Sequence, residues 1–173
     1  MPRLRQPPSA RLMAWTAFWV FLLDQATKWL VVHALDLRSR LEIDVLPPFL
    51  NLRMAWNRGV NFGLLAEVDM RWVLVALALG ISAFVVIWVR RDGGSRLVLV
   101  SAGLLVGGAL GNVVDRVLYG AVADFLNMSC CGIENPYAFN LADIAIVLGA
   151  VGLVLFAGRG KGAAKPRRAA KTG

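Results

Sequence analysis

Asp124 and Asp143 are the side chains in this sequence with the clearest potential for chemistry. Asp124 stands among apolar residues in the segment 120–125, so its presence there is not explained by exposure of an ordinary surface carboxylate to water. Asp143 is predicted to lie about two turns inside a helix that begins at about Tyr137, at a rise of about 1.5 Å per residue. If the two carboxyl groups converge, like-charge repulsion and desolvation raise the pKa of one of them. One protonated and one ionised carboxyl group can together activate water and polarise a peptide carbonyl, which is the chemistry of an aspartyl protease.

The same two aspartates also permit a purely structural interpretation. Each could pair separately with a basic side chain, for example Arg116 or Lys28. An ion pair of that kind would stabilise the fold and would leave no carboxyl pair for catalysis. Spacing alone leaves both interpretations open.

Other polar side chains stand inside apolar stretches, where they are rare and by default indicate a function. Asp24 and Lys28, with Gln25 beside them, lie four residues apart on one face of a predicted helix. They form either a structural ion pair turned into the protein or part of a site. A second polar group shares a helix face by i, i+3, i+4 spacing and consists of Asn112, Asp115 and Arg116.

The elements that must position these residues are predicted to be membrane-spanning helices. The chain has 173 residues, of which 58% are hydrophobic and only 17% charged, and a chain of this length cannot bury such an excess in one core. A spanning helix needs about 20 mostly apolar residues. Four stretches qualify, at about 12–35, 72–89, 97–114 and 137–156. The third contains glycines at four-residue spacing, which predict close helix packing: Gly103, Gly107 and Gly111.

The first stretch resembles a secretory signal peptide because it follows three arginines. It is too long for the apolar region of such a peptide, however, and it contains Asp24 and Lys28. It also lacks an Ala-x-Ala cleavage site. We therefore expect it to be a retained span.

The distribution of basic residues predicts the orientation of these spans. Arginine and lysine concentrate in the N-terminal tail, in the link between the second and third spans, and in the basic tail 158–173. The segments 36–70 and 115–136 are balanced or acidic. The positive-inside rule places both termini in the cytoplasm and these two segments outside. The same distribution accounts for the net charge of +8 without a nucleic-acid partner.

The outer segment at about 41–66 is predicted to contain strands. Apolar and polar residues alternate over 41–45 and again over 50–54, on either side of a pair of prolines, as in half-buried strands. The tripeptide at 57–59 is a turn signal. We therefore predict an all-α membrane protein, one integral-membrane domain over 1–173, with four transmembrane helices and a small outward-facing β-sheet between the first two spans.

Metal and disulfide chemistry have little support in the sequence. Cys130 and Cys131 are adjacent, which favours two free thiols, with a strained vicinal disulfide as the alternative. The single histidine, His33, is expected to be an interfacial side chain. No HExxH motif, Cys/His cluster or phosphate-binding loop occurs, so we predict no metal and no cofactor.

Five segments together resemble the prolipoprotein signal peptidases, or signal peptidase II, of bacterial inner membranes. Each segment alone is a weak signal, but they occur in the family's order on a four-span chain of the family's length. The segments are 24–28 (DQATK), 57–63 (NRGVNFG), 107–116 (GGALGNVVDR), 120–125 (GAVADF) and 139–143 (FNLAD).

This resemblance implies an aspartyl endopeptidase without metal, whose catalytic pair is Asp124 and Asp143. Its substrate would be a prolipoprotein whose cysteine already bears a diacylglyceryl group. Cleavage would release the signal peptide on the amino side of that cysteine, at the periplasmic face of the inner membrane. We expect a monomer in contact with membrane lipid. The implied supporting or substrate-binding residues are Asn57, Gly59, Asn112, Arg116, Asn140, Asp24, Gln25 and Lys28.

Two other classes of function remain open on the residues alone. A small transporter or proton carrier could use the intramembrane charged residues as a relay, although the inverted repeat of many transporter folds is not visible. A structural membrane subunit would need no acid pair. The residues of such a relay would be Asp24, Lys28, Asp115, Arg116 and Asp143.

Overall fold

The computed structural model describes residues 10–59, 70–132 and 135–158. Residues 60–66 of the expected outer β segment lie outside this description. Residues 159–173 of the expected basic tail also lie outside it.

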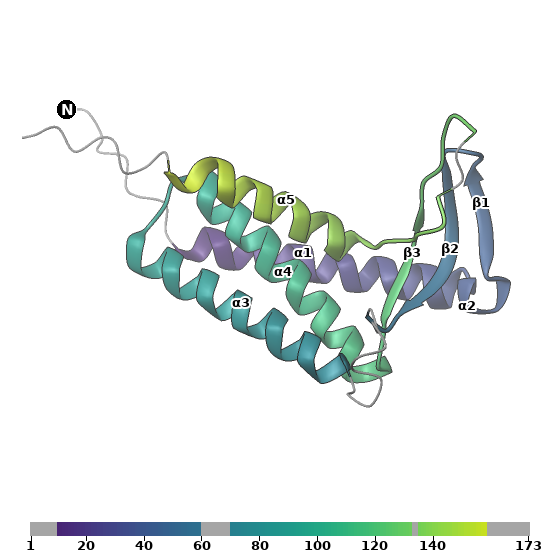
Figure 1. Ribbon diagram of the computed structural model, residues 1–173, viewed down its shortest axis with the longest axis horizontal. Helices are drawn as coiled ribbons and strands as arrows, with labels where there is room; N and C mark the ends of the chain where they lie inside the picture. The colour runs from purple at the N-terminus through teal and green to yellow at the C-terminus, as the bar shows by residue number, and fades with distance from the viewer. Residues whose placement is uncertain (1–9, 60–69, 133–134, 159–173) are drawn as a thin grey trace, which may run out of the picture.

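The described residues form four long helices that lie side by side, with a small sheet across one end (Figure 1). The helices are α1 (Ala10–Trp29), α3 (Met70–Asp92), α4 (Arg96–Tyr119) and α5 (Leu141–Phe156). A π-helical turn, η1 (Leu30–Ala34), and a short helix, α2 (Leu37–Arg40), follow α1. The first apolar stretch was expected to continue as one helix to residue 35, but its regular part ends at Trp29.

Helix α4 is the centre of the bundle and packs against α1, α3 and α5. Within the described residues, α3 and α4 are long and apolar enough to cross a membrane, with mean hydropathies of 2.6 and 2.1, whereas α5 is apolar but shorter. Of the apolar window in α4, 72% is buried inside the protein, but only 22% of that in α3. A helix as apolar and as exposed as α3 is accommodated by lipid rather than by water.

Glycines allow α4 to approach its neighbours closely. A Cβ atom on Gly107 would lie 2.5 Å from the carbonyl oxygen of Ala17 in α1. A Cβ atom on Gly108 would lie 2.5 Å from the carbonyl oxygen of Ala142 in α5. The packing role predicted for the glycines of this helix is therefore confirmed, and it extends to helices on two sides of α4.

The sheet is antiparallel, in the order β1 (Glu42–Leu46), β2 (Leu50–Asn57) and β3 (Val122–Asn127). The two alternating segments at 41–45 and 50–54 are strands, as predicted. The expectation that the sheet lies only between the first two spans is wrong, because β3 comes from the segment between α4 and α5. Side chains on both faces of β3 are buried, so its sequence lacks the alternation that identifies a half-exposed strand.

The start of α5 also differs from the prediction. The helix begins at Leu141 rather than at about Tyr137, because Asn140 caps it. The Asn140 side chain accepts a hydrogen bond from the Asp143 backbone N–H, and the Asp143 side chain accepts one from the Asn140 backbone N–H. This is a capping box. Asp143 therefore lies in the first turn of α5 and not two turns inside it.

The loop after β3 carries the two cysteines. Cys130 and Cys131 are exposed free thiols, with their Sγ atoms 2.8 Å apart. The expectation of free thiols is confirmed.

Replacing Gly108 by alanine tests the close packing of α4. The new methyl group meets backbone atoms of α5, which cannot move aside as a flexible side chain would, so we expect Gly108→Ala to lower stability by about 1–3 kcal/mol. Gly80→Ala in α3 is the matched control, because a Cβ there has no neighbour within 4 Å. Thermal unfolding in detergent should show a lower Tm for Gly108→Ala only. Equal effects of both variants would contradict the packing role.

Candidate active site

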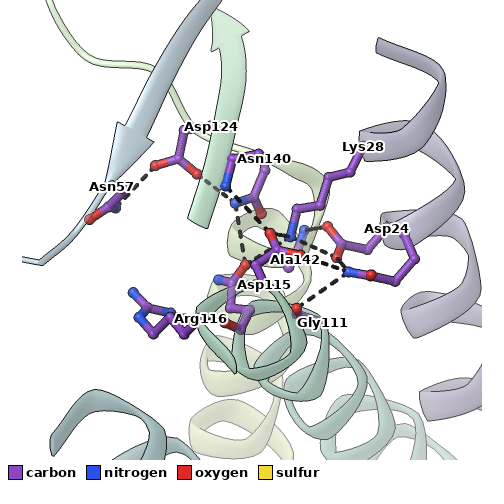
Figure 2. Close-up of polar contacts among 12 residues, drawn as sticks. Asp24, Lys28, Asn57, Gly111, Asp115, Arg116, Asp124, Asn140 and Ala142 are labelled. Carbon is purple, nitrogen blue, oxygen red and sulfur yellow. Dashed lines mark hydrogen bonds and ion pairs between the residues drawn. The ribbon is translucent and has the colours of Figure 1, made fainter. Parts of the chain in front are cut away.

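A buried cluster of charged side chains lies where α1, α4 and the sheet meet (Figure 2). The Lys28 Nζ lies 2.8 Å from a carboxylate oxygen of Asp24 and 2.8 Å from one of Asp115. The exposed fractions of Asp24, Lys28 and Asp115 are 0%, 5% and 2%. The ion pair predicted from the spacing of Asp24 and Lys28 is thus confirmed. Asp115, on the far side of the lysine, was not among the predicted site residues.

Hydrogen bonds connect this cluster to the surrounding elements. Gln25 in α1 donates to an Asp115 carboxylate oxygen at 3.1 Å. The backbone N–H of Ala142, at the start of α5, donates to Asp24 at 3.0 Å. The backbone N–H of Ala123 in β3 donates to Asp115 at 3.4 Å. One group of charges therefore joins α1, α4, α5 and β3.

Asp124 projects from β3 and accepts hydrogen bonds on both carboxylate oxygens (Figure 2). The Asn57 Nδ2 donates to one oxygen at 3.0 Å, and the Asn140 Nδ2 donates to the other at 2.6 Å. The pairing of β2 with β3, in which Ala55 lies opposite Asp124, brings Asn57 to this face. Asp124 is 3% exposed.

Asp143 lies beside the same asparagine. Besides its capping bonds with Asn140, it accepts a hydrogen bond from the Asn112 Nδ2 in α4 at 2.9 Å. Asn140, which is fully buried, therefore hydrogen bonds to both Asp124 and Asp143. The Asn112 Oδ1 accepts from the Lys28 Nζ at 3.1 Å and from the Asn140 Nδ2 at 3.3 Å. The side-chain amide of Asn112 therefore links the two acid residues to the charged cluster around Lys28.

The environment of Asp124 disfavours its charged form. Burial, and then repulsion from the nearby Asp143, raise the pKa of Asp124 to about 6. Hydrogen bonds from Asn57 and Asn140, which favour the charged form, oppose this shift without cancelling it. The carboxyl group of Asp124 therefore holds a proton far more readily than an ordinary aspartate does.

The turn that follows β2 orients Asn57. Its side-chain oxygen accepts a hydrogen bond from the Gly59 N–H at 2.9 Å, which leaves the amide nitrogen to donate to Asp124. Gly59 has φ +90°, and a Cβ there would lie 2.6 Å from a methyl carbon of Leu74 in α3. The backbone conformation therefore favours glycine here, and a larger residue would also have to displace the Leu74 side chain. The turn predicted at 57–59 is confirmed through Gly59.

The alternative in which each aspartate pairs with a basic side chain has no support in the structure. Neither Asp124 nor Asp143 forms an ion pair with a basic side chain of the described residues, and Lys28 pairs with Asp24 and Asp115 instead. The Arg116 Nη1 donates to the carbonyl oxygen of Asn112 at 3.3 Å, and its buried Nε has no hydrogen-bond partner among the described residues. Nor do the described residues contain a group of three or more His, Cys, Asp or Glu side chains that could hold a metal ion.

An apolar groove of about 430 Å³ lies between α3, α4 and α5, and neither Asp124 nor Asp143 is among the side chains that line it. Side chains of α3, α4 and α5 line it, and its polar groups are Asn112 and Arg116. Because Asn112 also donates to Asp143, the groove reaches the shell of side chains around the acid residues.

Comparison with known proteins identifies the family of this chain. Residues 16–158 match the family model described as signal peptidase (SPase) II. A lipoprotein signal peptidase of Methylobacterium sp. strain 4-46 is 46% identical over 142 residues, which cover 81% of this chain and 84% of the relative. One from Burkholderia vietnamiensis is 40% identical over 155 residues, which cover 87% and 91%.

Two solved structures of bacterial membrane enzymes share the fold. One superposes with a TM-score of 0.74 at 24% identity, covering 88% of this chain and 96% of the other. The second has a TM-score of 0.68 at 24% identity, covering 91% and 94%. From the family match and the close relatives, the chain belongs to the signal peptidase II family, and its apolar helices make it a membrane protein.

Proposed function

We propose that this chain is an aspartyl endopeptidase that removes signal peptides from prolipoproteins. The bond cleaved lies on the amino side of a cysteine that already bears a diacylglyceryl group. The observation that carries this proposal is the joint hydrogen bonding of Asp124 and Asp143 to the buried Asn140. Family membership supports it independently.

The two aspartates have different environments, and this assigns them different roles. Asp143 lies in the first turn of α5 and accepts hydrogen bonds from the Asn140 backbone N–H and the Asn112 Nδ2. Burial raises the pKa of Asp124 to about 6, and this favours its acid form. In this proposal Asp143 is the base and Asp124 is the acid.

The reaction then proceeds without a covalent intermediate. Asp143 takes a proton from water, whose oxygen attacks the scissile carbonyl carbon, while Asp124 gives its proton to the carbonyl oxygen. The tetrahedral intermediate returns that proton to Asp124. Asp143 then passes its proton to the leaving amine of the lipid-bearing cysteine as the C–N bond breaks. Asn57, Asn112 and Asn140 hold the two carboxyl groups in place throughout.

The proposal places the acids at the outer surface of the bacterial inner membrane, in one integral-membrane domain over 1–173. Helices α1, α3, α4 and α5 are its four spans, with both termini in the cytoplasm. The basic link between α3 and α4, at the end of the bundle away from the sheet, supports this orientation (Figure 1). The apolar groove accepts acyl chains or the apolar part of the signal peptide, and Arg116 with Asn112 contacts the polar part. A monomer suffices for this arrangement.

Replacing either acid by asparagine tests the proposed chemistry. Asp124→Asn and Asp143→Asn each remove one partner in proton transfer, so we expect cleavage to fall by about 10²–10⁴-fold. The measurement is a gel assay of a lipidated precursor with the purified enzyme. Asp44→Asn is the control, since Asp44 is exposed and lies on β1, the strand that does not pair with β3. Normal cleavage by either active-site variant would remove the acid pair from the mechanism.

The pH dependence of cleavage tests the role of the Asp124 proton. Because the pKa of Asp124 is raised to about 6, the acid form is present below pH 6 and is lost above it. We therefore expect kcat/KM, which reports the free enzyme, to fall above about pH 6. A bound substrate excludes more water, so the corresponding fall in kcat should occur at higher pH.

Asn57→Ala provides a second measurement on the same group. Asn57 favours the charged form of Asp124 through its hydrogen bond, so its removal should raise the pKa and move the fall in kcat/KM to higher pH. Asn51→Ala, on the same strand but without a bond to Asp124, should leave the profile unchanged. A profile that stays in place or moves to lower pH in Asn57→Ala would contradict the assignment of the proton to Asp124.

A further inference from the structure

The sheet separates the acid residues from a second recess on its opposite face. Successive side chains of a strand point to opposite faces, and Trp56 and Ala123, which lie opposite each other in β2 and β3, precede Asn57 and Asp124. Trp56 and Ala123 line a recess of about 380 Å³ between the end of α1, η1, the sheet and the last residue of α4. A smaller, adjoining recess of about 230 Å³ shares Arg38, Trp56 and Tyr119 with this larger one.

Basic side chains line both recesses, and no carboxylate of the described residues does. Lys28 and His33 line the larger recess, Arg58 lines the smaller one, and Arg38 lines both. The Lys28 ammonium is already paired with Asp24 and Asp115. Neither Arg38 nor Arg58 has an ion pair with a described residue, and both are exposed. The two guanidinium groups thus provide positive charge that is not compensated within the described chain.

The remaining walls are aromatic and apolar. Trp29, Trp56 and Tyr119 are 63%, 39% and 57% exposed, although large aromatic side chains are ordinarily well buried. Tryptophan and tyrosine are enriched where a membrane meets water. Leu22 and Val32 continue the larger recess along α1 and η1. A free phosphate ion has no partner on such a wall, whereas the glycerol and acyl chains of a lipid do.

We propose that these adjoining recesses bind the headgroup of an anionic phospholipid. Arg38 and Arg58 bind the phosphate, for which the planar guanidinium group is well suited. The aromatic rings contact the glycerol region, and the acyl chains run along Leu22 and Trp29. This site is separate from the groove between α3, α4 and α5, because the two have no lining residue in common. It does not depend on the proposed peptidase activity.

Lipid binding to the purified full chain in detergent tests this site. Native mass spectrometry would compare phosphatidylglycerol with phosphatidylcholine of the same acyl chains, with the wild type expected to favour the anionic lipid by about tenfold. Arg38→Gln/Arg58→Gln should abolish most of this preference. The control is Arg40→Gln/Arg53→Gln, which removes two charges from α2 and β2, near Arg38 and Arg58 in the sequence but outside both recesses. It should retain the preference.

Three outcomes would overturn the proposal. The first is a wild type that binds both lipids equally, and the second is an equal loss of preference in the two double variants, which would indicate a general effect of charge. The third is displacement of phosphatidylglycerol by millimolar inorganic phosphate, which would show an ion site without lipid recognition. Retention of phosphatidylglycerol in excess phosphate would support the lipid as occupant.

Discussion

Asn140 joins two carboxyl groups that the chain brings together from different elements. Its Nδ2 donates to Asp124 at 2.6 Å, and its backbone N–H donates to Asp143 at 3.1 Å. Since Asn140 is fully buried, its amide has no water with which to exchange these bonds. Backbone hydrogen bonds between Leu126 in β3 and Phe139 hold the start of α5 next to the strand, and the Asn140 side chain, which also caps the helix, connects the two carboxyl groups. The proposed catalytic pair depends on this double role.

The charged cluster around Lys28 holds that arrangement in place. Removing charges from water costs several kcal/mol for each ion, and only good pairing offsets this cost. Here one lysine serves two aspartates from α1 and α4, and backbone N–H groups of Ala123 and Ala142 complete the shell. Through Asn112 the cluster also orients an amide that binds Asp143. The residues considered for a transport relay therefore lie in one connected network that supports the acid residues.

The sequence was sufficient to predict the features that depend on local patterns. Hydropathy gave the helices to within a few residues, and four-residue spacing gave the Asp24–Lys28 pair and the glycine packing. It was not sufficient for features that depend on distant partners. The strand β3 is buried on both faces and so lacks alternation, and only its pairing with β2 brings Asn57 to Asp124. The position of Asp143 was misjudged because apolar residues before Asn140 resemble the helix that follows its cap.

The central claim is that the acid pair holds a single proton on Asp124 near pH 6. Infrared difference spectroscopy of the purified protein, titrated through this range, measures the carboxylic acid C=O stretch directly. We expect one acid band that disappears with an apparent pKa of about 6 and is absent from Asp124→Asn. A band that persists unchanged in Asp124→Asn, or a wild type in which both groups ionise together at the ordinary pKa of aspartate, would contradict it.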